Sequence, residues 1–194
     1  MDPPKEDAMR ADAQANRDAV VAAARRLVAS RGTTVSVNAI AAEAGVGVAT
    51  LYRHFATRDD LLYAIAVDTR ERIAAIMDRY CAEVTPDPET WWASFVRDVA
   101  ALRPGALVSI VVDALTDGAD VSKFVALRTE ALESLETVVS LARRVGVVRD
   151  DLTAVQFQLG LATVTRPLPT GADIPDLAEH ERWLVETYIR GLRA

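Results

Sequence analysis

The side chains best suited to chemistry in this 194-residue chain lie on residues 48–54, where hydroxyl, guanidinium and imidazole groups share one face of a predicted helix. Leu51 and Phe55 are four residues apart and can anchor that helix inward, so the other side chains face outward. Groups of these types hydrogen bond to phosphates and base edges, and small apolar groups contact thymine methyl groups. The segment therefore predicts recognition of a nucleic acid.

The elements that must position this face form a predicted helix-turn-helix over residues 33–58. Ser36 is a good N-cap residue for the first helix, in which apolar residues recur at helical spacing from Val37 to Ala44. Gly45 follows the last periodic residue, where a left-handed C-cap favours glycine. So short a turn forces the two helices across each other, which is the geometry that places the second helix in a DNA major groove.

The segment AAEAGVGVATLYRHFATRDDLL resembles the DNA-binding signature of the tetracycline-repressor (TetR/AcrR) family of one-component bacterial transcription regulators. The similarity covers about residues 13–75, and its G-V-x-x-x-T-L-Y-x-H-F core is specific. The C-terminal two thirds of the chain carries no motif of similar strength. The resemblance implies a dimeric repressor that binds a pseudo-palindromic operator in double-stranded DNA and is released from it by a small apolar ligand.

The resemblance also implies roles for single residues. Tyr52 and His54 resemble the phosphate-contacting pair of the family, and Arg58 occupies the site usually held by a lysine. The positions of Gly47 and Val48 are frequently polar in the family, and this chain departs from that pattern. Base reading here would therefore combine apolar contacts with hydrogen bonds from a few polar side chains.

Asn38 and Arg53 are the main candidates for those hydrogen bonds, whereas Thr50 is as readily an internal bracket of the motif. Thr57 can cap a further long helix, whose N-terminus would offer backbone N–H groups and a favourable dipole to a phosphate. The residues predicted to contact DNA are Ser36, Asn38, Val48, Ala49, Thr50, Tyr52, Arg53, His54 and Arg58.

Hydrophobic periodicity along the whole chain predicts an all-α protein of about nine helices without strand alternation. We expect a three-helix DNA-binding domain over residues 12–58 and a helical ligand-binding and dimerisation domain over residues 59–194. The first helix should run from about Asp12 or Asn16 to Ser30. Residues 1–11 contain two prolines and mixed charges without periodicity, so we expect a mobile arm there.

Aromatic bulk on several helices of the larger domain predicts an apolar pocket for a small-molecule effector. The sequence does not separate such a pocket from a filled core. The residues assigned to it are Met77, Trp91, Trp92, Phe95, Val111, Phe124, Arg128 and Phe157.

The last two predicted helices, 153–165 and 176–192, are the candidates for the homodimer interface, because they carry small residues and more apolar surface than a terminal helix normally exposes. Burial of the same face within one chain remains the alternative. The interface residues predicted are Phe157, Gly160, Leu161, Trp183, Leu184, Tyr188 and Ile189.

Composition limits the remaining function classes. The net charge is −6, yet residues 13–58 hold six arginines against Asp18 and Glu43, which fits a DNA-facing end on an acidic body. Cys81 is the single cysteine, so we expect no disulfide, no structural zinc and no cofactor. With two histidines and no catalytic constellation, an enzyme is not expected.

The N-terminus lacks the apolar core of a signal peptide, and the longest apolar stretch, 106–112, is far too short for a membrane span. We therefore expect a cytoplasmic protein without membrane contact. The alternative function is a helical protein-interaction module that binds neither DNA nor an effector.

Overall fold

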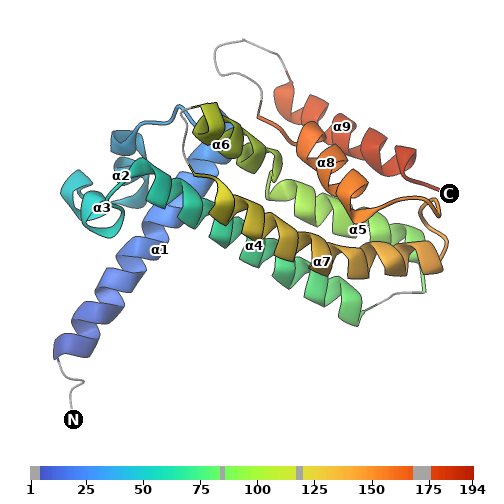
Figure 1. The fold of residues 1–194 in the computed structure, drawn as a ribbon, viewed down its shortest axis with the longest axis horizontal. Helices are drawn as coiled ribbons and strands as arrows, with labels where there is room; N and C mark the ends of the chain where they lie inside the picture. Colours follow the sequence, from blue (N-terminus) through green and yellow to red (C-terminus); the bar gives the residue numbers. More distant parts are fainter. Residues whose placement is uncertain (1–4, 84–85, 117–119, 168–175) are drawn as a thin grey trace.

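The computed structural model describes residues 5–83, 86–116, 120–167 and 176–194, and within these ranges it contains nine α-helices and no strand (Figure 1). The helices are α1 (Lys5–Arg31), α2 (Val37–Ala44), α3 (Val48–His54), α4 (Arg58–Ala82), α5 (Pro88–Ala101), α6 (Gly105–Thr116), α7 (Ser122–Arg144), α8 (Ala154–Val164) and α9 (Leu177–Gly191). The predicted all-α class is confirmed.

The start of α1 differs from the prediction, because residues 5–11 are helical and do not form an arm. No proline or glycine interrupts the chain between Lys5 and Arg31, and alanine-rich sequence favours helix even where nothing packs against it. The first half of α1 extends away from the other helices (Figure 1), and continuous burial begins only at Val20. Residues 1–4 of the predicted arm lie outside the described residues.

The local signals that end and begin helices act as the sequence predicts. The Ser36 hydroxyl accepts a hydrogen bond from the backbone N–H of Ala39 at 3.2 Å, and Gly45 has a φ of 68°. Thr57 and Asp60 form a reciprocal capping box at the start of α4. These caps fix the orientation at which each helix leaves its turn.

The buried side chains form two hydrophobic cores. The first joins α1, α2, α3 and the first part of α4, to Ala66, with Ala106 and Ile110 of α6 and Phe124 of α7. The second joins the later part of α4, from Met77, with α5, α7, α8 and α9. We call α1–α3 with α4 to Ala66 the head, and the rest of the chain the body.

α4 contributes to both cores and lies alongside α7 for most of its length (Figure 1). A single rigid helix therefore runs from the head into the body. Among the described residues no single helix is both long and apolar enough to cross a membrane; α5 and α6 reach that length only as a pair, with a 42° bend between them.

Candidate nucleic-acid interface

The second helix of the motif, α3, is held by apolar contacts to α2 and α1. Leu51 and Phe55 are buried in the head core together with Ile40 of α2. The turn between α2 and α3 is closed by backbone hydrogen bonds, among them Val46 N–H to the carbonyl of Ala41 at 3.0 Å. Because this packing fixes the buried side of α3, its opposite side is presented as a rigid surface.

That surface carries most of the residues predicted to read bases. Asn38, Val48, Ala49, Tyr52 and Arg53 are all exposed. The side chains of Asn38 and Arg53 make no hydrogen bond or ion pair to any residue that the structure describes, so they are available to a partner. Tyr52 is 51% exposed, so its ring and hydroxyl are open to a partner.

Two other predicted contact residues are partly withdrawn from the surface. Thr50 is half-buried, and the hydroxyl of Ser36 is engaged as the N-cap of α2. His54 is also half-buried, and its Nε2 atom is shielded from solvent without a hydrogen-bond partner in the described part of the chain. Of the pair that the sequence assigned to phosphate, only Tyr52 is therefore openly accessible in this conformation.

Arg58 lies at the predicted end of the motif but is engaged within the chain. Its Nη1 donates to the carbonyl oxygen of Val35 at 3.1 Å, and its Nη2 donates to the carbonyl oxygen of Thr33. The guanidinium thus fastens the α1–α2 loop to the start of α4. In this structure Arg58 is engaged with two backbone carbonyl oxygens, and its binding of phosphate stays a prediction.

The N-terminus of α4 is partly satisfied by its own capping box. The backbone N–H of Thr57 donates to the Asp60 carboxylate at 3.0 Å, and the backbone N–H of Asp60 donates to the Thr57 hydroxyl at 3.1 Å. The Thr57 hydroxyl and backbone N–H donate to the Asp60 carboxylate and hold its pKa below the usual range. With Asp59 beside it, this helix end presents negative charge, which disfavours the phosphate that we expected there.

Several basic side chains of the head are also engaged. Arg17 stacks over the Phe55 ring, 5.1 Å from its centroid. Arg25 pairs with Asp68 at 2.9 Å, and Arg26 pairs with Glu43 at 3.1 Å. Within the described residues, Arg31 and Arg53 are the arginines of segment 13–58 without such a contact. These contacts fix where the guanidinium groups lie, and only the two ion pairs offset positive charge.

The residues predicted to line an effector pocket do not form one site. Met77, Trp91, Trp92, Phe95 and Phe157 lie in the body core, all at most 3% exposed. The last four pack on one another with ring centroids 5.2–6.3 Å apart, so these side chains fill the core. The indole N–H of Trp92 is buried there without a partner in the described chain.

The other three predicted pocket residues lie elsewhere. Arg128 is exposed and donates to the Gln158 side chain at 2.9 Å, while Val111 packs against the head core. Phe124 borders a cavity of about 270 Å³ between α4, α6 and α7. The cavity is lined by Asp59, Leu62, Ile110, Ala114, Asp120, Lys123 and Phe124.

The residues predicted for the dimer interface are mostly buried inside the chain itself. Phe157, Leu161 and Ile189 are each at most 3% exposed in the body core, so they cannot meet a partner without unfolding. Gly160 faces Tyr188 of the same chain, whose hydroxyl donates to the carbonyl oxygen of Phe157 at 2.7 Å. Burial therefore leaves Phe157, Leu161 and Ile189 no surface for a subunit interface, while the other interface residues stay predictions.

The outer face of the same two helices is apolar. Val155 and Leu159 of α8 are 43% and 52% exposed, and Trp183 of α9 is 55% exposed; Leu184 is half-buried. The sequence signal for Val155 and Leu159 was present, because both are apolar and one turn apart on the side of α8 away from Phe157. Of the predicted interface residues, Trp183 is the most exposed, with its ring stacked on His180 at 5.6 Å between centroids.

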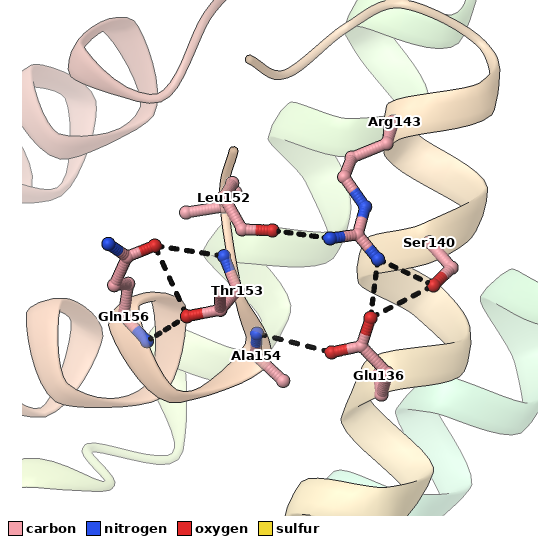
Figure 2. Close-up of polar contacts among 7 residues, drawn as sticks. All are labelled: Glu136, Ser140, Arg143, Leu152, Thr153, Ala154 and Gln156. Carbon is pink, nitrogen blue, oxygen red and sulfur yellow. Dashed lines mark hydrogen bonds and ion pairs between the residues drawn. The ribbon is translucent and has the colours of Figure 1, made fainter. Parts of the chain in front are cut away.

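A polar network holds the start of α8 against α7 (Figure 2). Arg143 donates to the carbonyl oxygen of Leu152 at 2.9 Å and also pairs with Glu136, which accepts from the Ala154 backbone N–H at 3.4 Å. Burial alone would raise the pKa of Glu136, but hydrogen bonds from Ser140, Ala154 and Arg143 outweigh it and keep that pKa below the usual range. The network fixes the position from which α8 presents its outer face.

Nothing in the described ranges resembles a metal site, since no group of three or more His, Cys, Asp or Glu side chains could hold an ion. Cys81 is a half-buried free thiol, and burial raises its pKa.

Comparison with protein families gives two matches. Residues 20–65 match bacterial regulatory proteins of the tetR family, and residues 87–194 match the C-terminal domain of SbtR-like transcriptional regulators. The second match covers more than half of the chain. Together the two matches include the helix-turn-helix and nearly all of the body.

Individual proteins agree with this. An HTH-type transcriptional regulator of Staphylococcus aureus (strain USA300) is 43% identical over 58 residues, 29% of this chain and 31% of the relative. The chain is thus aligned with less than a third of that relative's length. A TetR transcriptional regulator from Streptomyces coelicolor has a TM-score of 0.64 at 26% identity, covering 91% of this chain and 98% of the other. A TetR regulator from Mycobacterium vanbaalenii gives 0.63 at 28% identity, covering 96% and 99%.

Proposed function

The chain belongs to the TetR family of bacterial transcriptional regulators, and from that premise we propose that it is a homodimeric repressor of a pseudo-palindromic operator. The observation that carries the proposal is the rigid outer face of α3. There Tyr52 and Arg53 are exposed and, among the described residues, without partners, on a helix anchored by Leu51.

Specificity would come from two kinds of contact. Val48 and Ala49 are exposed and apolar, so they suit thymine methyl groups, while Asn38 and Arg53 can hydrogen bond to base edges in the major groove. Tyr52 would contact a phosphate and fix the register without reading sequence. In this division residues 12–58 bind DNA, and residues 59–194 dimerise and respond to an effector, in the cytoplasm.

The dimer would form through the outer face of α8 and α9. Leu159 and Trp183 supply large exposed apolar groups there, and two such helix pairs would make a four-helix bundle across a two-fold axis. A symmetric dimer places two reading helices about 34 Å apart, which is one turn of DNA. One head alone contacts too little groove for high affinity.

An effector would act through the cavity beside Phe124. Its walls combine apolar side chains with the charged Asp59, Asp120 and Lys123, so a small, mainly apolar ligand with a polar group there would contact the first turns of α4 directly. Its size of about 270 Å³ suits a compound near the small end of ligand sites. Such a ligand would weaken DNA binding only as far as it prefers the released state.

The test begins with selection of binding sites from random double-stranded DNA by the purified chain. Fluorescence anisotropy then measures the affinity of the selected site against scrambled DNA of equal length. We expect a site with two-fold symmetry that binds at least about a thousandfold more tightly than scrambled DNA. Arg53→Ala should reduce that ratio.

The matched control is Arg144→Ala, which removes the same charge from an exposed position at the far end of α7. It should leave the ratio unchanged. If no DNA site is enriched, or if selected and scrambled DNA bind equally well, the repressor proposal is wrong. The alternative function, a helical protein-interaction module, would then take its place.

A further inference from the structure

The corner between α5 and α6 contains an arginine in a backbone conformation that favours glycine. Arg103 has a φ of 53°, in the left-handed region that side chains with a Cβ rarely adopt, and Pro104 follows it. A residue keeps such a conformation only when surrounding contacts offset its cost. The contacts of the Arg103 side chain therefore indicate its role.

The guanidinium of Arg103 joins two helices that are distant in sequence. Its Nη1 donates to the carbonyl oxygen of Ala29 at 2.9 Å, and its Nη2 pairs with a carboxylate oxygen of Glu181. Ala29 lies in the last turn of α1, where carbonyl groups lack partners within the helix and a cation is favoured by the helix dipole. Arg103 thus caps the head helix α1 while it holds α9 of the body.

This contact is better shielded than most ion pairs among the described residues, although Arg25 and Asp68, at 17% and 24% exposed, are shielded further. The side chains of Arg103 and Glu181 are only 24% and 29% exposed, and burial lowers the pKa of Arg103. Interactions between charges are screened less when water is partly excluded. The pair is therefore suited to hold a fixed geometry.

The same corner is pressed against α8. The backbone N–H of Gly105 donates to the Thr165 hydroxyl at 3.0 Å, and a Cβ at Gly105 would lie 2.3 Å from the carbonyl oxygen of Ala162. The corner consequently touches α1 of the head and both helices whose outer face forms the proposed dimer contact. Besides α4, the head is joined to the body by the packing of Ala106, Ile110 and Phe124 in its core, and Arg103 adds the tie that reaches α9.

We propose that Arg103 is a positioning residue for DNA binding: by joining α1 to Glu181 of α9, it sets the angle of the head relative to the α8–α9 pair. In a symmetric dimer that angle determines the distance between the two reading helices. The inference rests on the proposed function, namely that the chain binds a two-fold DNA site as a dimer.

The test compares Arg103→Gly with Arg97→Ala. Glycine removes the guanidinium and relieves the positive φ, so the fold is retained. Arg97 is a matched control, because it pairs with Glu186 of α9 through two contacts of 2.6 and 2.8 Å but joins α9 to α5 within the body, away from the head. Affinity is measured for the selected site and for versions with one or two base pairs inserted between the half-sites.

We expect wild type and Arg97→Ala to reject the lengthened sites equally. Arg103→Gly should bind the original site more weakly and lose roughly fivefold or more of its discrimination between spacings, the lower range of typical coupling between sites. Arg103→Lys, which keeps a charge for Glu181, should recover part of the discrimination. Hydrogen exchange at residues 29–35 should be faster in Arg103→Gly without DNA present.

The outcomes separate the two proposals. A wild-type chain that selects no DNA site would overturn the proposed function and with it this role. A wild type that discriminates spacing, together with a folded Arg103→Gly that discriminates equally well, would overturn the role of Arg103 alone. Equal loss in Arg97→Ala would also overturn it, because the effect would then belong to any pair that holds α9.

Discussion

Gly160 gives the sharpest test of how α8 and α9 are used. The sequence suggests that this glycine lets a partner subunit approach, whereas the structure places Tyr188 of the same chain against it. A Cβ at residue 160 would lie 2.5 Å from Cε2 of Tyr188 and 2.8 Å from its hydroxyl oxygen. We therefore predict that Gly160→Ala destabilises each folded chain and leaves the contact between chains intact.

The magnitude follows from three terms. Carbon atoms pack at about 3.5–4.0 Å, so the ring must move, and overpacking of this kind costs about 1–3 kcal/mol. Movement also breaks the buried hydrogen bond from Tyr188 to the carbonyl of Phe157, worth about 1 kcal/mol. Alanine returns about 1 kcal/mol through its higher helix propensity.

The net loss is about 2 kcal/mol, or roughly 4–8 °C in Tm for a chain of this size. Thermal and urea unfolding measure it, and sedimentation velocity measures the dimer. Gly191→Ala is the matched control in α9, because nothing lies within 4 Å of its added Cβ. It should change stability by less than about 1 kcal/mol, in the stabilising direction.

A Gly160→Ala chain with the wild-type Tm and a weaker dimer would refute the reasoning. That result would mean that Tyr188 has another place to lie and that residue 160 meets the partner subunit. Unchanged stability in both Gly160→Ala and Gly191→Ala would show that the space beside residue 160 adapts more freely than close packing allows.

Four further predictions concern the head, the corner and the α7–α8 network. Asn38→Ala should reduce discrimination at particular base pairs by roughly 1–3 kcal/mol in competition titrations; equal losses on all sequences would argue against base reading. Arg58→Ala should lower Tm but leave the slope of log affinity against log salt within about half a unit of wild type, since its guanidinium binds backbone carbonyls; a drop of about 0.9 per subunit would indicate a phosphate contact. Gly105→Ala should cost about 3 kcal/mol or more in urea unfolding, because its Cβ meets backbone atoms that cannot rotate away. Because the folded-state pKa of Glu136 is lowered, its contribution is present above the usual glutamate pKa and is lost as pH falls through the folded value. Glu136→Gln should therefore remove less than about 1 kcal/mol at pH 7, since the pair is half exposed, and flatten the loss of stability between about pH 5 and 3.

The sequence predicted the helix-turn-helix well because its signals are local. Ser36, Gly45 and Thr57 act on the backbone within a few residues, so their spacing is enough to place each helix end. The start of α1 was missed for the opposite reason. The charges and prolines of the first eleven residues indicate an arm. Between Lys5 and Arg31, however, no proline or glycine breaks the helix.

The roles of Arg58 and His54 could not be read in the same way. Side-chain spacing shows which face of a helix a residue occupies, but the partners of Arg58 are carbonyl oxygens of a loop more than twenty positions away. The shielding of Nε2 in His54 likewise depends on how neighbouring helices pack. Long-range contacts with backbone atoms leave no pattern in a single sequence.

Periodicity also identified the apolar stripes of α8 and α9 without showing which stripe meets which partner. When a helix carries apolar residues on two sides, one side packs in the core of its own chain and the other side stays exposed. Phe157 and Leu161 form the inner stripe, and Val155 and Leu159 form the outer one. Tertiary packing decides which stripe is buried, and in α8 it buries the stripe that carries the ring of Phe157.

The electrostatics of the head lead to a final consequence for DNA binding. Ion pairs, cation–π stacking and backbone hydrogen bonds engage Arg17, Arg25, Arg26 and Arg58, while Asp59 and Asp60 occupy the start of α4. Only the ion pairs of Arg25 and Arg26 offset positive charge, whereas Arg17 and Arg58 remain cationic, because an aromatic ring and carbonyl oxygens carry no net charge. Under the proposed function, affinity for the operator rises when two linked heads bind at once, provided that their separation matches the spacing of the half-sites. The tie from Arg103 to α1, as we propose it, acts on that separation and therefore on the affinity gained by binding with both heads.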